Sequence, residues 1–122
     1  MSSPVQNRIG CVFIPVSDMV RAQTWYNRLL GLQPSETSHE GKIADVPMAG
    51  ETQLILDSHK PVVNSSQPLF FFWTDDLSAA CHFLQSLDVD IVSPIEDIGS
   101  VSTLVFRDPD NNLLMVCKRR SP

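Results

Sequence analysis

Apolar positions along the chain follow two periods, a short one typical of strands and a longer one typical of helices. An apolar run at 10–16 predicts a strand. From Met19 to Leu30 apolar side chains recur at helical spacing, which predicts an amphipathic helix. Asp18 is a good N-cap before this helix, and Gly31 suits a left-handed cap after it. A strand followed by a capped helix therefore opens the chain.

The same pattern returns later with a constant offset. Asp76 precedes a second predicted helix whose apolar positions, from Leu77 to Leu87, repeat those of the first. The run from Leu69 to Thr74 shows no alternation, which predicts a strand buried on both faces. The remaining pattern predicts strands at 42–48, 52–57, 89–92, 100–106 and 113–118, turns at 49–51 and 107–112, a loop at 94–99, and a loop or weak edge strand at 33–41.

Each half of the chain thus predicts a βαβββ unit, with repeats at about 8–58 and 68–119 and a linker at 58–68 between them. One such unit leaves a sheet face uncovered, so two units have to pack or pair to close a core. The predicted fold class is α+β. The length of 122 residues fits a single domain spanning 1–122.

Composition narrows the class of protein. The net charge is −5, and the basic residues are scattered except for the cluster Lys118, Arg119 and Arg120, which argues against a nucleic-acid partner. This acidity is mildly compatible with a cationic ligand, although a role in solubility explains it better. No apolar stretch is long enough to cross a membrane, and three unpaired cysteines favour neither a disulfide framework nor a zinc site. We expect a cytoplasmic protein.

Two segments resemble a known family. With the duplicated unit in place, VSDMVRAQTWYNRLLGL at 16–32 and FRDPDNNLLMV at 106–116 resemble the strand–helix signature and the last hairpin of the vicinal oxygen chelate superfamily. That superfamily includes glyoxalase I, bleomycin-resistance and fosfomycin-resistance proteins and extradiol dioxygenases. The resemblance implies two tandem βαβββ units that form an eight-stranded cup, usually within a homodimer, with the ligand held in the cup.

The resemblance also implies where a metal would bind. Metal-dependent members use four His, Glu or Gln side chains, and carrying those positions over reaches Cys11, Ile55, Leu69 and Met115. Zinc, nickel, iron and manganese favour imidazole nitrogen or carboxylate oxygen, which none of these residues offers. A soft ion held by Cys11, Met115 and Cys117 is a weaker hypothesis than apolar packing. We therefore predict no metal and no cofactor.

Other residues offer little catalytic chemistry. His39, His59 and His82 are far apart in sequence, without the spacing of a metal pair, and are expected at the surface. Cys11 has no basic neighbour in sequence to activate a thiolate. Two sets of carboxylates remain: Asp45 and Asp57 are candidates for acid–base work or simple strand-end residues in water, whereas Asp108 and Asp110 are expected to hold a tight turn.

An apolar and aromatic ligand site is what remains. Alternate strand positions, including Leu104 and Phe106 beside Met115, are expected to face the ligand. The leading hypothesis is a metal-free, homodimeric small-molecule-binding protein of the bleomycin-resistance type, with a role in resistance or sequestration. A metal-dependent lyase or dioxygenase and a non-catalytic scaffold with a filled cup stay open as alternatives. The predicted ligand-binding residues are Cys11, Phe13, Gln53, Ile55, Leu69, Phe71, Trp73, Phe106 and Met115, and no catalytic residue is predicted.

Overall fold

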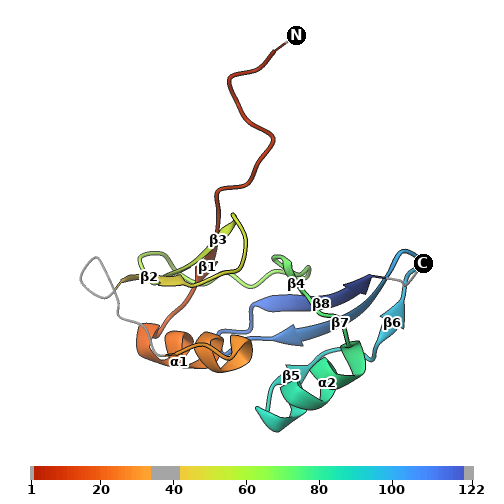
Figure 1. Cartoon of the computed structure of the whole chain (residues 1–122). Coiled ribbons are helices and arrows are strands. Elements are labelled where there is room, and N and C mark those ends of the chain that lie inside the picture. Colours follow the sequence, from red (N-terminus) through yellow and green to blue (C-terminus); the bar gives the residue numbers. More distant parts are fainter. Residues whose placement is uncertain (1, 34–41, 120–122) are drawn as a thin grey trace. The chain divides into compact units, whose positions relative to one another are not determined.

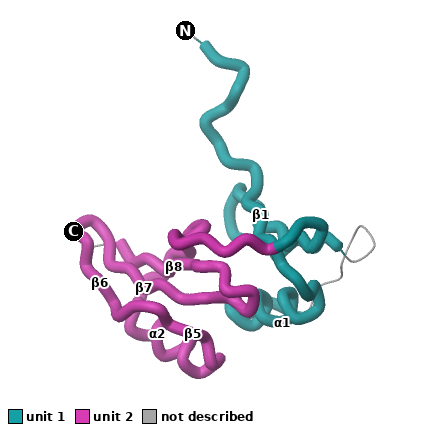
Figure 2. Tube along the Cα trace, turned by 180° about the vertical axis from the view of Figure 1, so that it is seen from behind, with its two compact units in different colours: residues 1–61 teal, residues 62–122 magenta. Residues whose placement is uncertain are grey.

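The structure, a computed structural model, describes residues 2–33 and 42–119. The chain divides into two compact units, Met1–Pro61 and Val62–Pro122, and the boundary falls within the predicted linker (Figure 2). The described residues form two helices and eight strands, so the predicted α+β class is confirmed (Figure 1). Whether the two units act as one domain stays a prediction.

Unit 1 contains one helix and a three-stranded sheet. Its elements are β1 (Cys11–Pro15), α1 (Met19–Leu30), β2 (Ile43–Val46) and β3 (Gln53–Asp57). The strand order is β1-β3-β2, with β1 parallel and β2 antiparallel to the central β3. The predicted loop or edge strand at 33–41 lies almost wholly outside the described residues.

The ends of α1 follow from local chemistry. Asp18 Oδ1 accepts a hydrogen bond from the Arg21 amide at 3.1 Å, which pairs one of the N–H groups that a first helical turn leaves open. Gly31 ends the helix with a φ of +68°, a left-handed conformation in which a side chain would be strained. Both predicted caps are confirmed.

The sheet of unit 1 has one closed face, which packs against α1. The strand side chains on this face are buried, and Ile14, Ala44 and Leu56 are fully so. They meet the buried stripe of α1, which includes Met19, Ala22 and Tyr26. The alternation along each strand leaves the opposite face, here called the open face of unit 1, with half-buried or exposed side chains.

Unit 2 repeats this plan with more strands. Its sheet has the order β4-β8-β7-β5, and β6 also pairs with β7. Two of its strands are only two residues long, and one of these, β6, lies in the predicted loop at 94–99. The elements are β4 (Phe71–Trp73), α2 (Leu77–Ser86), β5 (Asp90–Ile91), β6 (Glu96–Asp97), β7 (Val101–Arg107) and β8 (Leu113–Arg119).

The closed face of unit 2 packs against α2. Leu77 and Leu84 are the buried residues of the helix, which Asp76 caps by accepting from the Ala79 amide at 3.0 Å. The contacting strands β7 and β8 bury Leu104, Phe106, Leu114 and Val116 on the same side. The open face of unit 2 is the other side of this sheet.

Two sequence predictions about unit 2 are wrong. The run Leu69 to Thr74 is not buried on both faces, because α2 covers one face of the sheet and Phe71 and Trp73, on the other face, are 44% and 50% exposed. The β7–β8 register also differs from the prediction. The turn spans residues 108–112 and pairs Arg107 with Leu113, whereas a turn at 107–112 would have placed Phe106 there. A slip of one residue moves every side chain to the other face.

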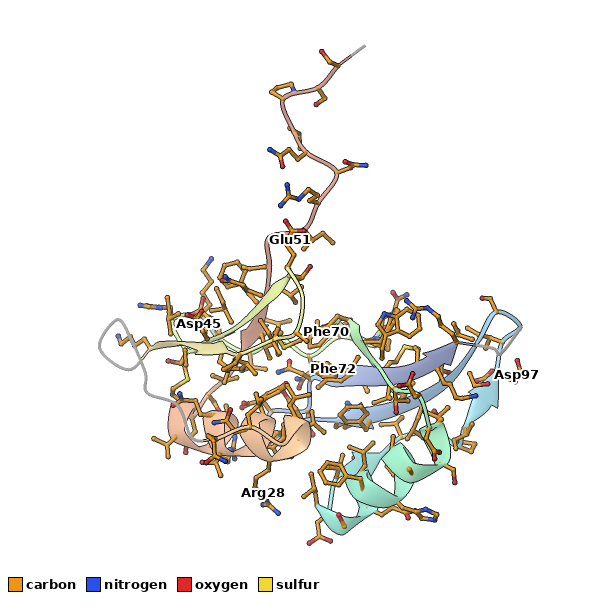
Figure 3. The ribbon with its side chains drawn as sticks, viewed as in Figure 1. Arg28, Asp45, Glu51, Phe70, Phe72 and Asp97 are labelled. Atoms are coloured by element: carbon orange, nitrogen blue, oxygen red, sulfur yellow. The ribbon has the colours of Figure 1, made fainter. Side chains whose placement is uncertain are left out.

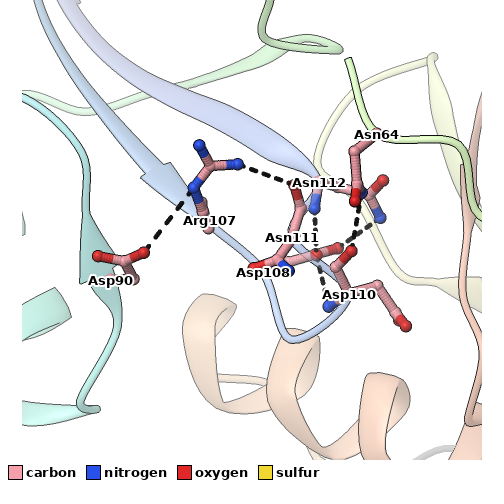
Figure 4. A network of polar contacts seen from close by, with 7 residues as sticks. All are labelled: Asn64, Asp90, Arg107, Asp108, Asp110, Asn111 and Asn112. Atoms are coloured by element: carbon pink, nitrogen blue, oxygen red, sulfur yellow. Dashed lines mark hydrogen bonds and ion pairs between the residues drawn. The ribbon is translucent and has the colours of Figure 1, made fainter. Parts of the chain in front are cut away.

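The turn between β7 and β8 is held by Asp108, a buried carboxylate (Figure 4). Its Oδ1 accepts from the amides of Asp110 and Asn112 at 2.9 and 2.8 Å, and its Oδ2 accepts from the Asn112 side-chain amide at 2.9 Å. Asn64 donates to the Asp110 carbonyl at 2.9 Å and so ties the segment before β4 to the turn. The structural role predicted for this aspartate is consistent with these contacts.

One further property concerns the helices. Among residues 2–33 and 42–119, neither helix combines the length and the apolar character that crossing a membrane requires.

Candidate ligand-binding faces

The open face of unit 1 brings together four of the predicted ligand-binding residues. The register pairs Cys11 with Gln53 and Phe13 with Ile55, so all four side chains share one side of the sheet. Phe13 is 58% exposed, and Cys11 and Ile55 are half-buried. Asp45 of β2, labelled in Figure 3, lies opposite Ile55 and adds a carboxylate to this face.

Asp57 lies at the end of this face and makes a local pair with His59. Asp57 Oδ1 accepts from the His59 amide at 2.8 Å and lies 3.2 Å from His59 Nδ1. The hydrogen bond from the His59 amide holds the pKa of the Asp57 carboxyl below its ordinary value of 3.8. The His59 imidazole and the charge of Lys60 act in the same direction, and burial opposes them. An open depression of about 340 Å³ adjoins the pair and is lined by Phe13, Pro15, Asp57, Lys60 and Pro61.

The open face of unit 2 is more aromatic. Phe71 lies opposite Met115 and Trp73 opposite Cys117, so these four residues share one side of the sheet. The Phe71 and Trp73 rings meet edge to face with their centroids 4.8 Å apart. Leu69, 40% exposed, precedes them and its amide donates to the Leu113 carbonyl. Phe70 and Phe72 alternate with them along the chain, and their own rings are 5.1 Å apart (Figure 3).

Arg119 lies at the end of the same open face. Its Cζ stands 3.9 Å from the centroid of the Trp73 ring, a cation–π contact. A second depression, of about 160 Å³, is lined by Trp73, Thr74, Asp75, Lys118 and Arg119. Arg119 was noted in the sequence only as part of a basic cluster. Arg119 lies four residues after Met115 on β8, and side chains an even number of residues apart on a strand share a face. This spacing was the signal that could have placed Arg119 on the open face.

Phe106 does not lie on the open face, contrary to the sequence prediction. It is fully buried on the closed face together with Leu104, because the five-residue turn pairs Val105 with Met115. The β7 residues that do share the face of Met115 are Val101, Thr103, Val105 and Arg107, which the sequence analysis missed. A correct turn length would have identified them.

The positions at which the resemblance implies a metal do not fit one here. Cys11 and Ile55 lie on the open face of unit 1, and Leu69 and Met115 on or beside that of unit 2, so their donors are one thiol and one thioether. No three His, Cys, Asp or Glu side chains gather around a possible metal position anywhere in the described ranges. Burial raises the pKa of the Cys117 thiol, which disfavours the thiolate that a soft metal needs.

The remaining candidates for chemistry are dispersed. His59 is paired with Asp57, His82 is exposed on α2, and His39 lies outside the described residues. Cys81 and Cys11 are half-buried free thiols in different units. The described residues therefore present two open sheet faces, one with carboxylates and one with paired aromatic rings.

Comparison with known proteins decides the family. A family model described as "Glyoxalase/Bleomycin resistance protein/Dioxygenase superfamily" matches residues 8–116. The chain belongs to this superfamily. The resemblance drawn from the two sequence segments is thereby confirmed. A search of curated proteins finds no match to this chain.

Solved structures of the superfamily share its fold. TnmS3, described as an antibiotic binding protein from Streptomyces sp. CB03234, is 23% identical, with a TM-score of 0.75 over 98% of this chain and 100% of its own. A glyoxalase/dioxygenase from Nostoc punctiforme is 15% identical, with a TM-score of 0.74 over 99% of both chains. A lactoylglutathione lyase from Agrobacterium tumefaciens is 16% identical, with a TM-score of 0.72 over 93% of this chain and 95% of its own. The fold thus spans both binding proteins and enzymes.

Proposed function

We propose that this chain binds a small, partly apolar or aromatic molecule without a metal ion. The observation that carries the proposal is the pair of exposed rings on the open face of unit 2, Phe71 and Trp73. Large apolar side chains left exposed in a contiguous patch mark interaction sites in soluble domains. Rings that meet edge to face form a rigid apolar surface on which a planar ligand can lie.

The chemistry at the carried-over metal positions supports the metal-free part of the proposal. Catalysis in metal-dependent members needs a metal that polarises an oxygen atom, and such a metal needs nitrogen or oxygen ligands. The aliphatic side chains of Ile55 and Leu69 provide neither. A binding protein, in contrast, gains affinity from these same apolar side chains because they leave water when a ligand is bound.

The relatives support a role in binding. The structure of TnmS3 is described as that of an antibiotic binding protein. We propose an analogous resistance or sequestration role for this chain, acting in the cytoplasm as a homodimer. The exposed apolar side chains on both open faces, Phe13 and Phe71 among them, support a dimer that covers part of this surface. Sedimentation analysis of the protein tests the dimer directly.

A titration of metal-stripped protein tests the proposed function. After treatment with a chelator, the protein is titrated by calorimetry with planar aromatic amides, beginning with naphthalene-2-carboxamide. We expect saturable binding that Phe71→Ala weakens about three- to tenfold, since ring–ring contacts contribute about 0.5–1.5 kcal/mol beyond area burial. Val20→Ala, which trims an exposed apolar side chain on α1, is the matched control and should leave the affinity unchanged.

Two outcomes would contradict the proposal. Turnover of substrate that requires added nickel, zinc, iron or manganese would favour the lyase or dioxygenase. A thermal-shift screen with planar and cationic compounds gives the second outcome. If no compound raises the Tm of the protein, a scaffold is favoured.

A further inference from the structure

The region around Trp73 carries a positive charge, although the chain as a whole has a net charge of −5. Arg119 shares the open face with Trp73, and Lys118 lines the adjoining depression. One carboxylate, that of Asp75, also lines it, so the cations there outnumber the anions. The overall acidity of the chain, which favours a cation in general, is therefore reversed at this place.

The guanidinium of Arg119 lacks the partner that the other strand arginine has. Arg107, on the same open face, forms an ion pair with Asp90 through Nε and Oδ2 at 3.8 Å. Within the described ranges, no carboxylate lies within ion-pair distance of Arg119, and its one recorded contact is the ring of Trp73.

The contact with Trp73 orients the guanidinium for a ligand. A guanidinium that stacks on an aromatic ring uses its flat face and leaves its N–H edge free. That edge presents donors with the spacing of a carboxylate's two oxygens. The Phe71 ring, 4.8 Å from Trp73, extends the apolar surface away from the charge. A charged group and two exposed aromatic rings therefore lie side by side.

The depression beside Arg119 has the size of an acidic group. Its volume of about 160 Å³ exceeds that of several waters at about 30 Å³ each, which leaves room for a carboxylate and the edge of a ring. The rest of a ligand would extend over Phe71, which is 44% exposed.

We propose that unit 2 recognises an aromatic carboxylate, with the ring on Phe71 and the carboxylate bound by the N–H edge of Arg119. This inference rests on the proposed function, since it assumes an aromatic ligand on the same face, and it names the charge that this ligand carries. Arg119 sets the preference for an acid over a neutral or basic analogue, and the rings supply affinity common to all three.

A matched set of three probes tests the proposal. Naphthalene-2-carboxylate, naphthalene-2-carboxamide and 2-(aminomethyl)naphthalene share one ring system and differ in charge. We expect the carboxylate to bind about tenfold more tightly than the amide, as for one charge-assisted pair at a partly exposed site, and the amine to bind most weakly. Added salt should weaken the binding of the carboxylate and leave the binding of the amide unchanged.

Variants separate the charge of Arg119 from the fold. Arg119→Gln should remove the preference for the carboxylate while the amide binds as before, and Arg119→Lys should keep only part of the preference, because it keeps the charge but loses the paired N–H donors. Arg28→Gln, which removes an exposed arginine from the last turn of α1, is the control of equal charge and should change neither affinity (Figure 3). A far-UV spectrum of each variant checks that it is folded.

The outcomes distinguish this inference from the proposed function. Equal binding of carboxylate and amide, or an equal loss of both in Arg119→Gln, overturns the aromatic carboxylate and leaves the aromatic ligand standing. Tighter binding of the amine than of the carboxylate also overturns it, since the cationic ligand would then be correct. No binding of any of the three overturns the proposed function and this inference together.

Discussion

Each unit has a closed sheet face, and the two closed faces are alike. The open faces of the two units differ. In unit 1 the buried side of the sheet is built on Ile14 and Leu56, and in unit 2 on Leu104 and Phe106, all fully buried beneath a helix that an aspartate caps. The open faces are unlike. Unit 1 exposes the carboxylate of Asp45 and holds Asp57 at its end, whereas unit 2 exposes paired rings beside Arg119.

This difference shows which part of a repeat has freedom to vary. The closed face has to exclude water, so any position on it has to be apolar and of a fitting size. The open faces carry this demand at fewer positions, because most of their side chains stay in contact with water; Thr103, Leu113 and Cys117 in unit 2 are the buried exceptions. Charge and aromatic content can therefore differ there without loss of the fold, and ligand specificity is expected on the open faces.

The largest expected effect comes from truncating the closed faces. Phe106→Ala should lower the free energy of unfolding by about 3–5 kcal/mol and Leu56→Ala by about 2–5 kcal/mol, through lost burial and the cavities left behind. Phe71→Ala and Phe13→Ala, on the open faces, should each cost less than about 1 kcal/mol. Urea unfolding measures all four. A cost for Phe71→Ala equal to that for Phe106→Ala would break the distinction between the faces.

The next effect comes from the turns that close the two hairpins. Asp108→Ala should cost about 2–4 kcal/mol, because it leaves the buried Asn112 amide, the part-buried Asp110 amide and the Asn112 side chain without their acceptor. Glu51→Ala, in the turn between β2 and β3 of unit 1, should cost at most about 0.5 kcal/mol, since its ion pair with Arg8 is exposed.

Urea unfolding again gives the values for the two turns. Similar losses in both variants would show that the hairpin turns do not differ in the way described, and a folded Asp108→Ala with full stability would rule out the network as a support.

The smallest effect concerns the charge of the open face of unit 1. Because the folded pKa of Asp57 lies below the unfolded value, its contribution to stability is complete above about pH 4 and is lost as the pH falls through the folded pKa. An NMR titration of the carboxyl carbon should give a midpoint below 3.8. His59→Ala should raise the midpoint only in part, since the backbone amide at position 59 still donates. A midpoint at or above 3.8 would contradict the pairing.

Local chemistry explains why the elements of unit 1 could be predicted. The caps at Asp18 and Gly31 depend on residues within one turn of the helix, so the sequence contains all the information. Alternation along β1 and β3 likewise predicted that Cys11, Phe13 and Gln53 share one face of the sheet. The parallel pairing of the two strands places paired residues on the same face. That these residues bind a ligand stays a prediction.

In unit 2, the faces on which several side chains lie could not be predicted from the sequence. The face to which Phe106 belongs depends on whether the turn contains five residues or six, and the polar run 107–112 is compatible with either. The exposure of Phe71 and Trp73 depends on what covers the face of the sheet opposite α2, which no local pattern encodes. Arg119 became a candidate only when the register joined it to Trp73.

Each unit contains one of the two tryptophans, so tryptophan fluorescence can follow the unfolding of each unit separately. Trp25, edge to face with Tyr26 on α1, belongs to unit 1, and Trp73 belongs to unit 2. Trp25→Phe and Trp73→Phe therefore yield single-tryptophan proteins whose fluorescence follows one half of the chain. If their denaturation curves coincide, the duplicated halves unfold cooperatively as one thermodynamic system, and if they separate, the linker joins two independent folding units.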